Sequence, residues 1–67
     1  MRMTNLVRYY RKRLGLSQVK LGLMVHCAQP NISAVERGAK PCWPALKRRL
    51  AEALGVQENE LFPEDEK

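Results

Sequence analysis

Cysteine, histidine and long apolar runs are scarce in this sequence, and their scarcity excludes several classes of protein. The only cysteines are Cys27 and Cys42, and a single bridge is too little to staple a small secreted domain. With His26 as the only histidine, the sequence offers no four-ligand set for a structural zinc ion. The short apolar runs follow no charged-then-apolar leader, so we expect neither a signal peptide nor a membrane span. The expectation is a cytoplasmic protein with reduced thiols and no bound metal or cofactor.

Acidic residues are almost absent from the first fifty positions. Residues 1–50 contain eleven Lys or Arg against Glu36 alone, whereas residues 51–67 contain six acids against Lys67. The formal net charge of +5 therefore combines a strongly basic body with an acidic end. A basic body is typical of proteins that bind a polyanion, usually a nucleic acid. The plainer alternative is a solvated surface, because net charge bears on partners and solubility rather than on fold.

Catalytic arrangements are missing as well. The only histidine, His26, falls at a predicted turn, and the carboxylates gather near the C-terminal end. No nucleophile is therefore accompanied by a base at a usable spacing, and no phosphate-binding glycine loop is present. We expect neither an enzyme nor a small-molecule substrate.

Strand-like alternation is lacking, and apolar residues recur instead at spacings of three and four, which indicates helices. Ser17 is the predicted N-cap of the second helix, and Thr4 of the first. Five helices are predicted, at about residues 5–14, 18–25, 29–37, 44–54 and 58–62. The predicted inward-facing side chains are those of Leu6, Val7, Tyr10, Leu14, Leu21, Val25, Ile32, Val35, Leu46, Leu50, Ala51 and Leu54.

The chain length of 67 residues allows one domain, with an acidic tail predicted at residues 63–67. A domain of this size buries only about 60% of the surface that its unfolded chain exposes, so its stability should be modest. His26 is predicted to adopt a positive φ, because the turn after the second helix must be tight and histidine is enriched in that region.

Several groups of residues occur together at a characteristic spacing. They are Leu16-Ser17-Gln18, Ile32-Ser33, Glu36-Arg37-Gly38, and Ala53-Leu54-Gly55-Val56 with Glu60-Leu61-Phe62. Together they make the chain resemble the Cro/repressor family of helix-turn-helix DNA-binding proteins over nearly its whole length. The resemblance implies an all-α, compact five-helix domain whose helix-turn-helix occupies about residues 17–37. In such a motif the second helix enters the major groove while the first braces against the DNA backbone.

Three positions depart from the pattern of the family. His26 stands where many relatives have glycine, Ala28 where they have Ser or Thr, and Gly22 where alanine is common. The first two departures leave the angle of the third helix open. Gly22 weakens the second helix by up to ~1 kcal/mol but permits a close approach.

The third predicted helix begins with Gln29-Pro30-Asn31 and carries no charge until Glu36. Glutamine and asparagine can bond both N6 and N7 of adenine, and an apolar edge such as proline can meet a thymine methyl. By position, the resemblance makes the base-reading residues Gln29, Pro30, Asn31 and Ala34, with Ser33 at the margin. The alternative is that Gln29 and Asn31 only cap the helix.

Phosphate contacts are expected on either side of the reading helix. The resemblance assigns Gln18 a contact with the DNA backbone, at a helix N-terminus that favours anions, and Ser17 and Lys20 lie beside it. Lys40, together with Lys47 or Arg48, forms a second candidate clamp. Trp43 is interpreted either as a partner of the sugar-phosphate edge or, preferably, as a partly buried lid on the core.

Arg11 borders the buried stripe of the first helix, and Glu36 is the lone acid of the basic half. The family pattern pairs such residues, so an Arg11–Glu36 ion pair is predicted to hold the third helix against the first.

The function predicted from the resemblance is a sequence-specific regulator of transcription that occupies a pseudo-palindromic DNA operator, as a repressor and a weak homodimer. The dimer contact is assigned to Val56, Leu61 and Phe62. The alternative is an antitoxin-like or other protein-interaction module that uses the same fold and binds through Leu23, Met24 and the acidic tail. Those two side chains could equally pack under Met1 and Met3.

Overall fold

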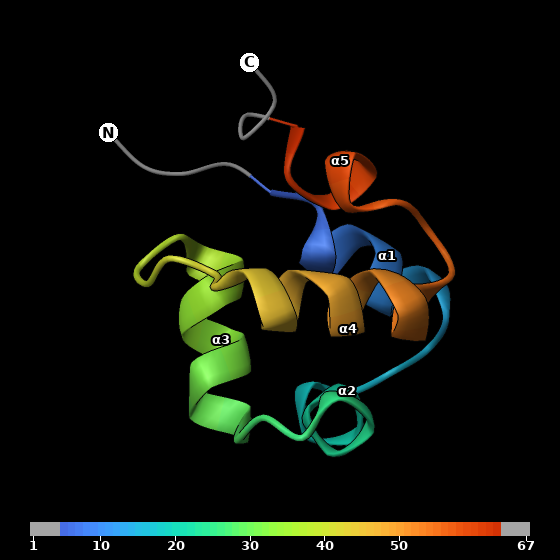
Figure 1. Ribbon diagram of the computed structural model, residues 1–67. Coiled ribbons are helices and arrows are strands. Elements are labelled where there is room, and N and C mark those ends of the chain that lie inside the picture. The colour runs from blue at the N-terminus through green and yellow to red at the C-terminus, as the bar shows by residue number, and fades with distance from the viewer. Residues whose placement is uncertain (1–4, 64–67) are drawn as a thin grey trace.

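The computed structural model describes residues 5–63, which form five α-helices and no strand (Figure 1). This confirms the predicted all-α, five-helix class. The helices are α1 (Val7–Arg13), α2 (Gln18–Val25), α3 (Gln29–Arg37), α4 (Pro44–Leu54) and α5 (Glu58–Leu61).

The helix α1 begins at Val7, later than the sequence predicts. The Asn5 side chain precedes it: its Oδ1 accepts a hydrogen bond from the Val7 backbone N–H at 3.2 Å. The Nδ2 group of Asn5 donates to the Val35 carbonyl oxygen at 2.9 Å. Asn5 therefore both starts α1 and ties it to the end of α3. The predicted N-cap, Thr4, lies outside the described residues.

Two of the four side chains predicted to face inward from α1 do not. Val7 is fully buried and Tyr10 packs partly against the core, but Leu6 and Leu14 are 37% and 54% exposed. The prediction was wrong because α1 is only seven residues long, so both leucines flank it rather than lie within it. The second buried residue of α1 is Arg11.

The turn chemistry of the helix-turn-helix agrees with the sequence. The Ser17 hydroxyl caps α2 by accepting a hydrogen bond from the Lys20 backbone N–H at 3.0 Å. His26 ends α2 with a φ of 61°, the predicted left-handed conformation. Pro30 occupies the first turn of α3, where its missing N–H costs no intrahelical hydrogen bond.

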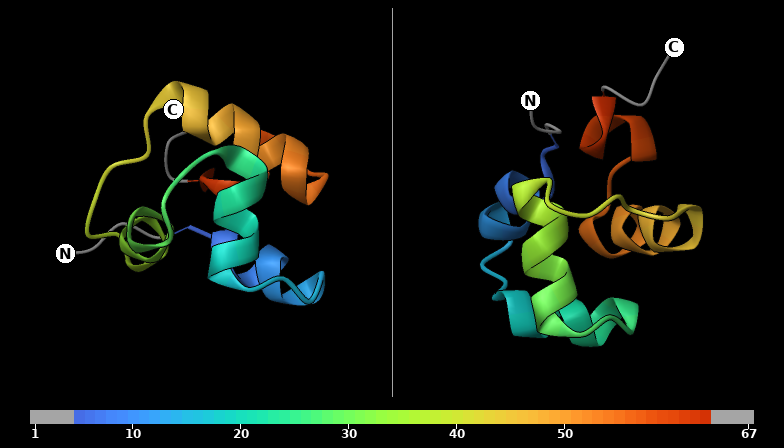
Figure 2. Two further views of the ribbon diagram at one scale, coloured as in Figure 1. Left: turned by 90° about the horizontal axis from the view of Figure 1, so that it is seen from below. Right: turned by 90° about the vertical axis from the view of Figure 1, so that its left-hand side faces the viewer.

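The helices α2 and α3 cross at a steep angle. Figure 1 shows α2 end-on and α3 lengthwise, and the view from below in Figure 2 shows the reverse. Behind this pair, the Arg49 guanidinium donates to the Val25 carbonyl oxygen at 3.4 Å and so links α4 to the end of α2. The longer helix α4 thus braces the helix-turn-helix at the end of α2, next to the turn.

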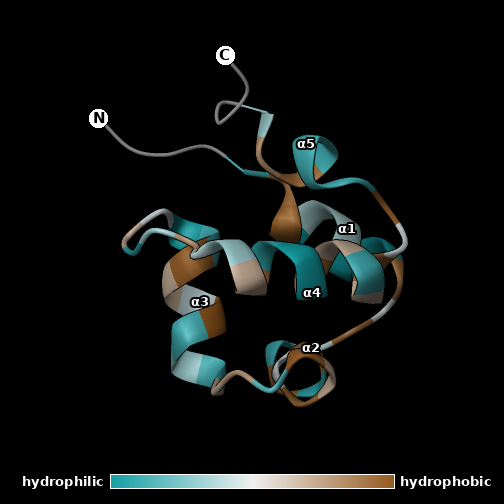
Figure 3. Cartoon of the chain, in the orientation of Figure 1, coloured by the Kyte–Doolittle hydropathy of each residue, from teal (hydrophilic) through white to brown (hydrophobic). Residues whose placement is uncertain are grey.

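All five helices contribute to one core. Hydrophilic and hydrophobic residues both occur within α3 and α4 (Figure 3), as expected of helices with one buried face. The inward positions predicted for α2, α3 and α4 are confirmed as buried. The core consists of Val7, Leu21, Val25, Ile32, Val35, Leu46, Leu50, Ala51, Leu54, Leu61 and Phe62.

Gly22 lies where α2 meets its own turn. The Cys27 backbone N–H donates to the Gly22 carbonyl oxygen at 2.8 Å, and a Cβ built on Gly22 would overlap the carbonyl oxygen of Cys27. An obstructing backbone atom cannot swing away as a flexible side chain can. The departure from the alanine common in the family therefore has a steric reason in this chain.

Replacing Gly22 with alanine should lower the free energy of unfolding by about 1–3 kcal/mol, as overpacking of an interior site does. In an exposed helix the same change would be stabilising by about 1 kcal/mol, so the sign of the effect is the test. Urea denaturation followed by circular dichroism measures it. Gly55→Ala is the control. A Cβ at position 55 would meet nothing within 4 Å, so this variant shows only the backbone strain of alanine at a φ of 73° and no overlap. Stabilisation by Gly22→Ala would contradict the close approach.

Candidate nucleic-acid interface

The predicted base-reading residues lie in the first two turns of α3. Pro30 is exposed, and Gln29, Asn31 and Ser33 are half-buried, so all four retain accessible surface. Ala34 is only 8% exposed. The assignment of Ala34 to base contact was therefore wrong: its side chain ends at Cβ and is covered by the protein itself.

The Arg11 and Glu36 side chains form an ion pair between α1 and α3. The Arg11 Nε donates to Glu36 Oε2 at 2.7 Å, and Nη2 donates to Oε1 at 3.2 Å. These side chains are only 8% and 3% exposed. The third nitrogen of the same guanidinium, Nη1, donates to the Leu16 carbonyl oxygen at 2.7 Å. Arg11 thus holds both α3 and the segment that leads into α2.

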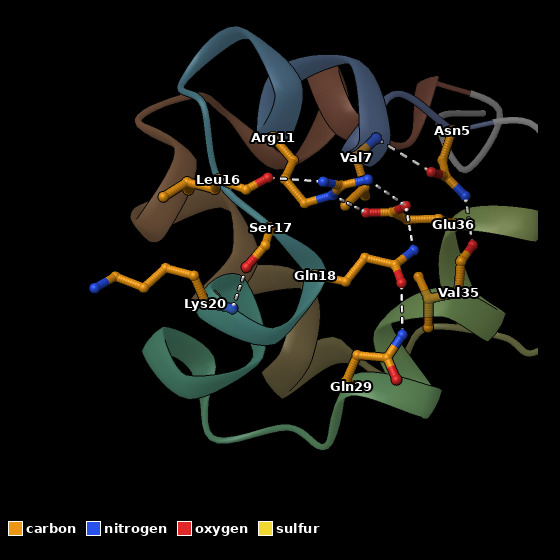
Figure 4. Close-up of polar contacts among 10 residues, drawn as sticks. All are labelled: Asn5, Val7, Arg11, Leu16, Ser17, Gln18, Lys20, Gln29, Val35 and Glu36. Atoms are coloured by element: carbon orange, nitrogen blue, oxygen red, sulfur yellow. Dashed lines mark hydrogen bonds and ion pairs between the residues drawn. The ribbon is translucent and has the colours of Figure 1, made fainter.

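Two glutamines extend the ion pair toward the start of α3 (Figure 4). The Gln18 Nε2 donates to Glu36 Oε1 at 3.1 Å. The Gln29 Nε2 in turn donates to Gln18 Oε1 at 2.6 Å. We call Arg11, Glu36, Gln18 and Gln29 the polar column.

The last bond of the polar column joins two helix N-termini. Gln18 is the first residue of α2, and Gln29 is the first residue of α3. Free backbone N–H groups and the positive end of the helix dipole make each N-terminus favourable for an anion. Ser17 and Lys20, the neighbouring phosphate candidates, are both exposed at the start of α2. The arrangement offers adjoining positive ends, with a cation beside one of them.

Of the two α4 cations predicted as alternatives to complete the second phosphate clamp, Lys47 lines a cavity together with Lys40. Lys40 and Lys47 line the same small cavity, of about 80 Å³, whereas Arg48 lines a separate groove on α4 and α5. The Lys40 ammonium donates to Asn31 Oδ1 at 2.9 Å, which links this cation to a predicted reading residue. The Lys47 ammonium lies 5.4 Å from the centroid of the Phe62 ring, a cation–π contact within the protein.

Trp43 does not seal the core. It is the N-cap residue of α4 and is 45% exposed, so the preferred interpretation as a partly buried lid was wrong. Its exposed area leaves the contact with a sugar-phosphate edge as a prediction.

The predicted dimer contact requires a larger correction. Leu61 is fully buried and Phe62 is only 4% exposed, and both belong to the core. They cannot present their side chains to a second copy, because the small domain uses them to close its own interior. Val56 is half-buried and lines the groove on α4 and α5. The remaining residues of this groove are Arg48, Ala51, Glu52, Gln57, Glu58 and Asn59.

Several positioning interactions do not follow from the sequence predictions. The sequence prediction places Asn5 only at the start of a helix, although asparagine before a helix is a recognisable cap signal. The role of Arg49 has no sequence signal, because nothing local distinguishes it from Arg48. The hydrogen bond between Gln18 and Glu36 leaves no local signal, since the residues are eighteen positions apart.

An apolar stripe is exposed on α2. Val19 and Leu23, four residues apart and so on one helix face, are 57% and 71% exposed, and nearby Met24 is 43% exposed. The alternative in which Leu23 and Met24 pack under Met1 and Met3 involves residues outside those described.

Metal-binding groups do not gather in the described part of the chain. Within residues 5–63 there is no group of three or more His, Cys, Asp and Glu side chains suited to a metal ion. Over the same residues, no helix has the length and apolar character needed to cross a membrane.

Comparison with known proteins relates the whole arrangement to one family. The helix-turn-helix domain family matches residues 2–61. The chain is similar to the restriction-modification controller protein C.AhdI from Aeromonas hydrophila, with 32% sequence identity. The crystal structure of that protein matches with a TM-score of 0.79 over 84% of this chain and 85% of that one. The clp gene regulator ClgR from C. glutamicum is 24% identical, with a TM-score of 0.74 over 81% of this chain and 70% of that one. Among curated proteins, none matches.

Proposed function

Because the chain belongs to the helix-turn-helix family of DNA-binding domains, we propose that it is a sequence-specific regulator of transcription that acts in the cytoplasm and has no catalytic role. The observation that carries the proposal is the pair of adjoining N-termini of α2 and α3, joined by the hydrogen bond between Gln18 and Gln29 at 2.6 Å. This pair lies within a body whose first fifty residues contain a single acid, Glu36. A basic frame around a weakly charged helix start suits a DNA groove.

Gln29 is the proposed centre of base recognition. One N–H of its amide is donated to Gln18, which leaves the second N–H and the Oε1 acceptor for a ligand. Adenine presents the matching pair in the major groove, with N7 as acceptor and the N6 amine as donor. Pro30, Asn31 and Ser33 would make the neighbouring contacts.

Phosphate affinity is assigned to the cations and helix ends around α3. Ser17, Gln18 and Lys20 would contact one strand at the N-terminus of α2. Lys40, whose ammonium bonds Asn31 at 2.9 Å, would contact the other, because an ammonium has three donors and only one is used. Such contacts raise affinity for all DNA sequences alike.

A dimer on a pseudo-palindromic operator would supply the remaining specificity, with half-site centres about 34–36 Å apart. The groove around Val56 is the proposed contact. It carries both signs of charge, so in an isologous pair Arg48 of one copy can face Glu52 or Glu58 of the other. Repression would follow from occupancy of the operator. C.AhdI is a controller protein and ClgR a gene regulator, which supports a regulatory role.

Selection of bound sites from a random pool of duplex DNA tests this function. The expected result is a palindrome whose half-site centres are one helical turn apart. Binding to the selected site should also weaken steeply with salt, because log K falls by ~0.9 for each phosphate neutralised per unit of log salt. With about six contacts across a dimer, affinity should drop roughly a thousandfold between 50 and 200 mM salt. A scrambled site of equal length is the control, and an enriched pool without any common sequence would refute the proposal.

A protein-interaction or antitoxin-like module is the second candidate. It is favoured by the exposed apolar stripe of α2, where Leu23 is 71% exposed. Contiguous apolar surface left exposed to solvent often marks a site that binds another protein. The salt series separates the two functions. If duplex DNA is not bound at 50 mM salt, the second candidate is preferred.

A further inference from the structure

Glu36 contacts more than its ionic partner. Its Oε1 accepts hydrogen bonds from Arg11 Nη2 at 3.2 Å and from Gln18 Nε2 at 3.1 Å. The Glu36 side chain is 3% exposed, and it lies seven positions after Gln29 on α3. Glu36 is therefore too deeply buried to touch DNA. It is nevertheless hydrogen-bonded to Gln18, which in turn is hydrogen-bonded to Gln29, the proposed reading side chain.

A carboxylate paired with an arginine accepts hydrogen bonds and does not donate them. The Gln18 amide must therefore turn its NH₂ group toward Glu36, because the opposite orientation would place two acceptors against each other. The Gln18 Oε1 then faces Gln29, and Gln29 must donate its own NH₂. Either side-chain amide alone could exchange the positions of its oxygen and nitrogen by a flip. The hydrogen bonds that start at the ion pair fix the orientation of both.

We propose that Glu36 is a specificity-determining positioning residue, which fixes the order of donor and acceptor on the Gln29 amide by way of Gln18. Arg11 holds the carboxylate in place through two hydrogen bonds. The proposal rests on the proposed function, in which Gln29 reads a base.

The fixed order has a definite consequence for base choice. Gln29 is left with Oε1 and one N–H to offer, which matches the N6 amine and N7 of adenine. Guanine presents O6 in place of the amine, so the Gln29 Oε1 would oppose another acceptor. A glutamine at position 36 can donate as well as accept, so the Gln18 amide would no longer be held in one orientation.

The first experiment uses the free, ¹⁵N-labelled protein and no DNA. In the wild type, the side-chain NH₂ signals of Gln18 and Gln29 should show one strongly hydrogen-bonded proton each and slowed exchange with solvent. In Glu36→Gln, both features should weaken. Glu60→Gln is the matched control: it makes the same chemical change at an exposed carboxylate of α5 and should leave both signals unchanged. Unchanged signals in Glu36→Gln would overturn the relay itself.

The second experiment first finds the operator position at which Gln29→Ala abolishes the preference for adenine. It then measures affinity for the selected operator and for a copy with guanine at that position. Glu36→Gln should lower the adenine-over-guanine ratio by about tenfold, within the range that one bidentate contact supplies. Glu60→Gln, the control, should keep the ratio. If Glu36→Gln does not fold, Gln18→Met breaks the relay, leaves the Arg11–Glu36 pair intact and should lower the ratio similarly.

The outcomes separate the two proposals. A wild type that prefers its operator, together with an unchanged ratio in Glu36→Gln, overturns the positioning role and leaves the regulatory function standing. A wild type without any operator preference overturns the function and the specificity role together, while the spectra of the free protein still decide whether the relay exists. A preferred base other than adenine at the Gln29 position overturns the donor–acceptor order proposed for this chain.

Discussion

Replacing Arg11 with methionine should lower the free energy of unfolding by about 3–5 kcal/mol, the typical cost of stranding one charge of a buried pair. The Glu36 carboxylate would lose two of its three hydrogen bonds and remain 3% exposed in a setting without its cation. Small domains have total stabilities near the lower end of about 5–15 kcal/mol. The variant should therefore be largely unfolded at 37 °C, as thermal denaturation followed by circular dichroism would show.

Two further variants separate the buried charge from other effects of the substitution. Arg8→Met removes an exposed cation from the same helix and should leave the melting temperature nearly unchanged. Arg11→Met combined with Glu36→Leu removes both charges and should recover much of the lost stability, because apolar replacement of a whole buried pair is often neutral. If the single variant Arg11→Met melts like the wild type, the ion pair contributes nothing to the position of α3.

Replacing Gln29 with alanine should reduce discrimination between the operator and random DNA by roughly 5- to 150-fold, which corresponds to about 1–3 kcal/mol for one bidentate base contact. The packing of the core should not change, because Gln29 is half-buried at the start of α3 and its side chain is hydrogen-bonded to Gln18. Binding curves for operator and scrambled duplexes at one salt concentration give the ratio directly.

Lys20→Ala is the matched control for this measurement. Lys20 is exposed near the start of α2, and as a phosphate contact it should weaken binding to every sequence about equally and reduce the salt slope by ~1. Lys40 is less suitable, because its ammonium bonds Asn31 and its removal would also disturb a reading residue. If Gln29→Ala and Lys20→Ala behave alike, the division between base reading and phosphate binding is wrong.

Local features of this protein were determined by the sequence alone. Ser17 caps α2, His26 adopts a positive φ, and Gly38 and Gly55 end α3 and α4. The buried faces of α2, α3 and α4 also follow from apolar spacing. Each of these depends on the backbone preferences of one residue or on neighbours within two helical turns, so the information lies close together along the chain.

The tertiary structure decided which surfaces remain for function. Ala34, Leu61 and Phe62 have residue types that suit an interface as well as a core, and only the packing of the other helices places them inside. The hydrogen bond from Asn5 to Val35 spans thirty positions, and the polar column joins residues up to twenty-five positions apart. Such contacts depend on the relative placement of α1, α2 and α3. Spacing along one helix does not specify that placement, because side chains from separate elements meet only when the whole core closes.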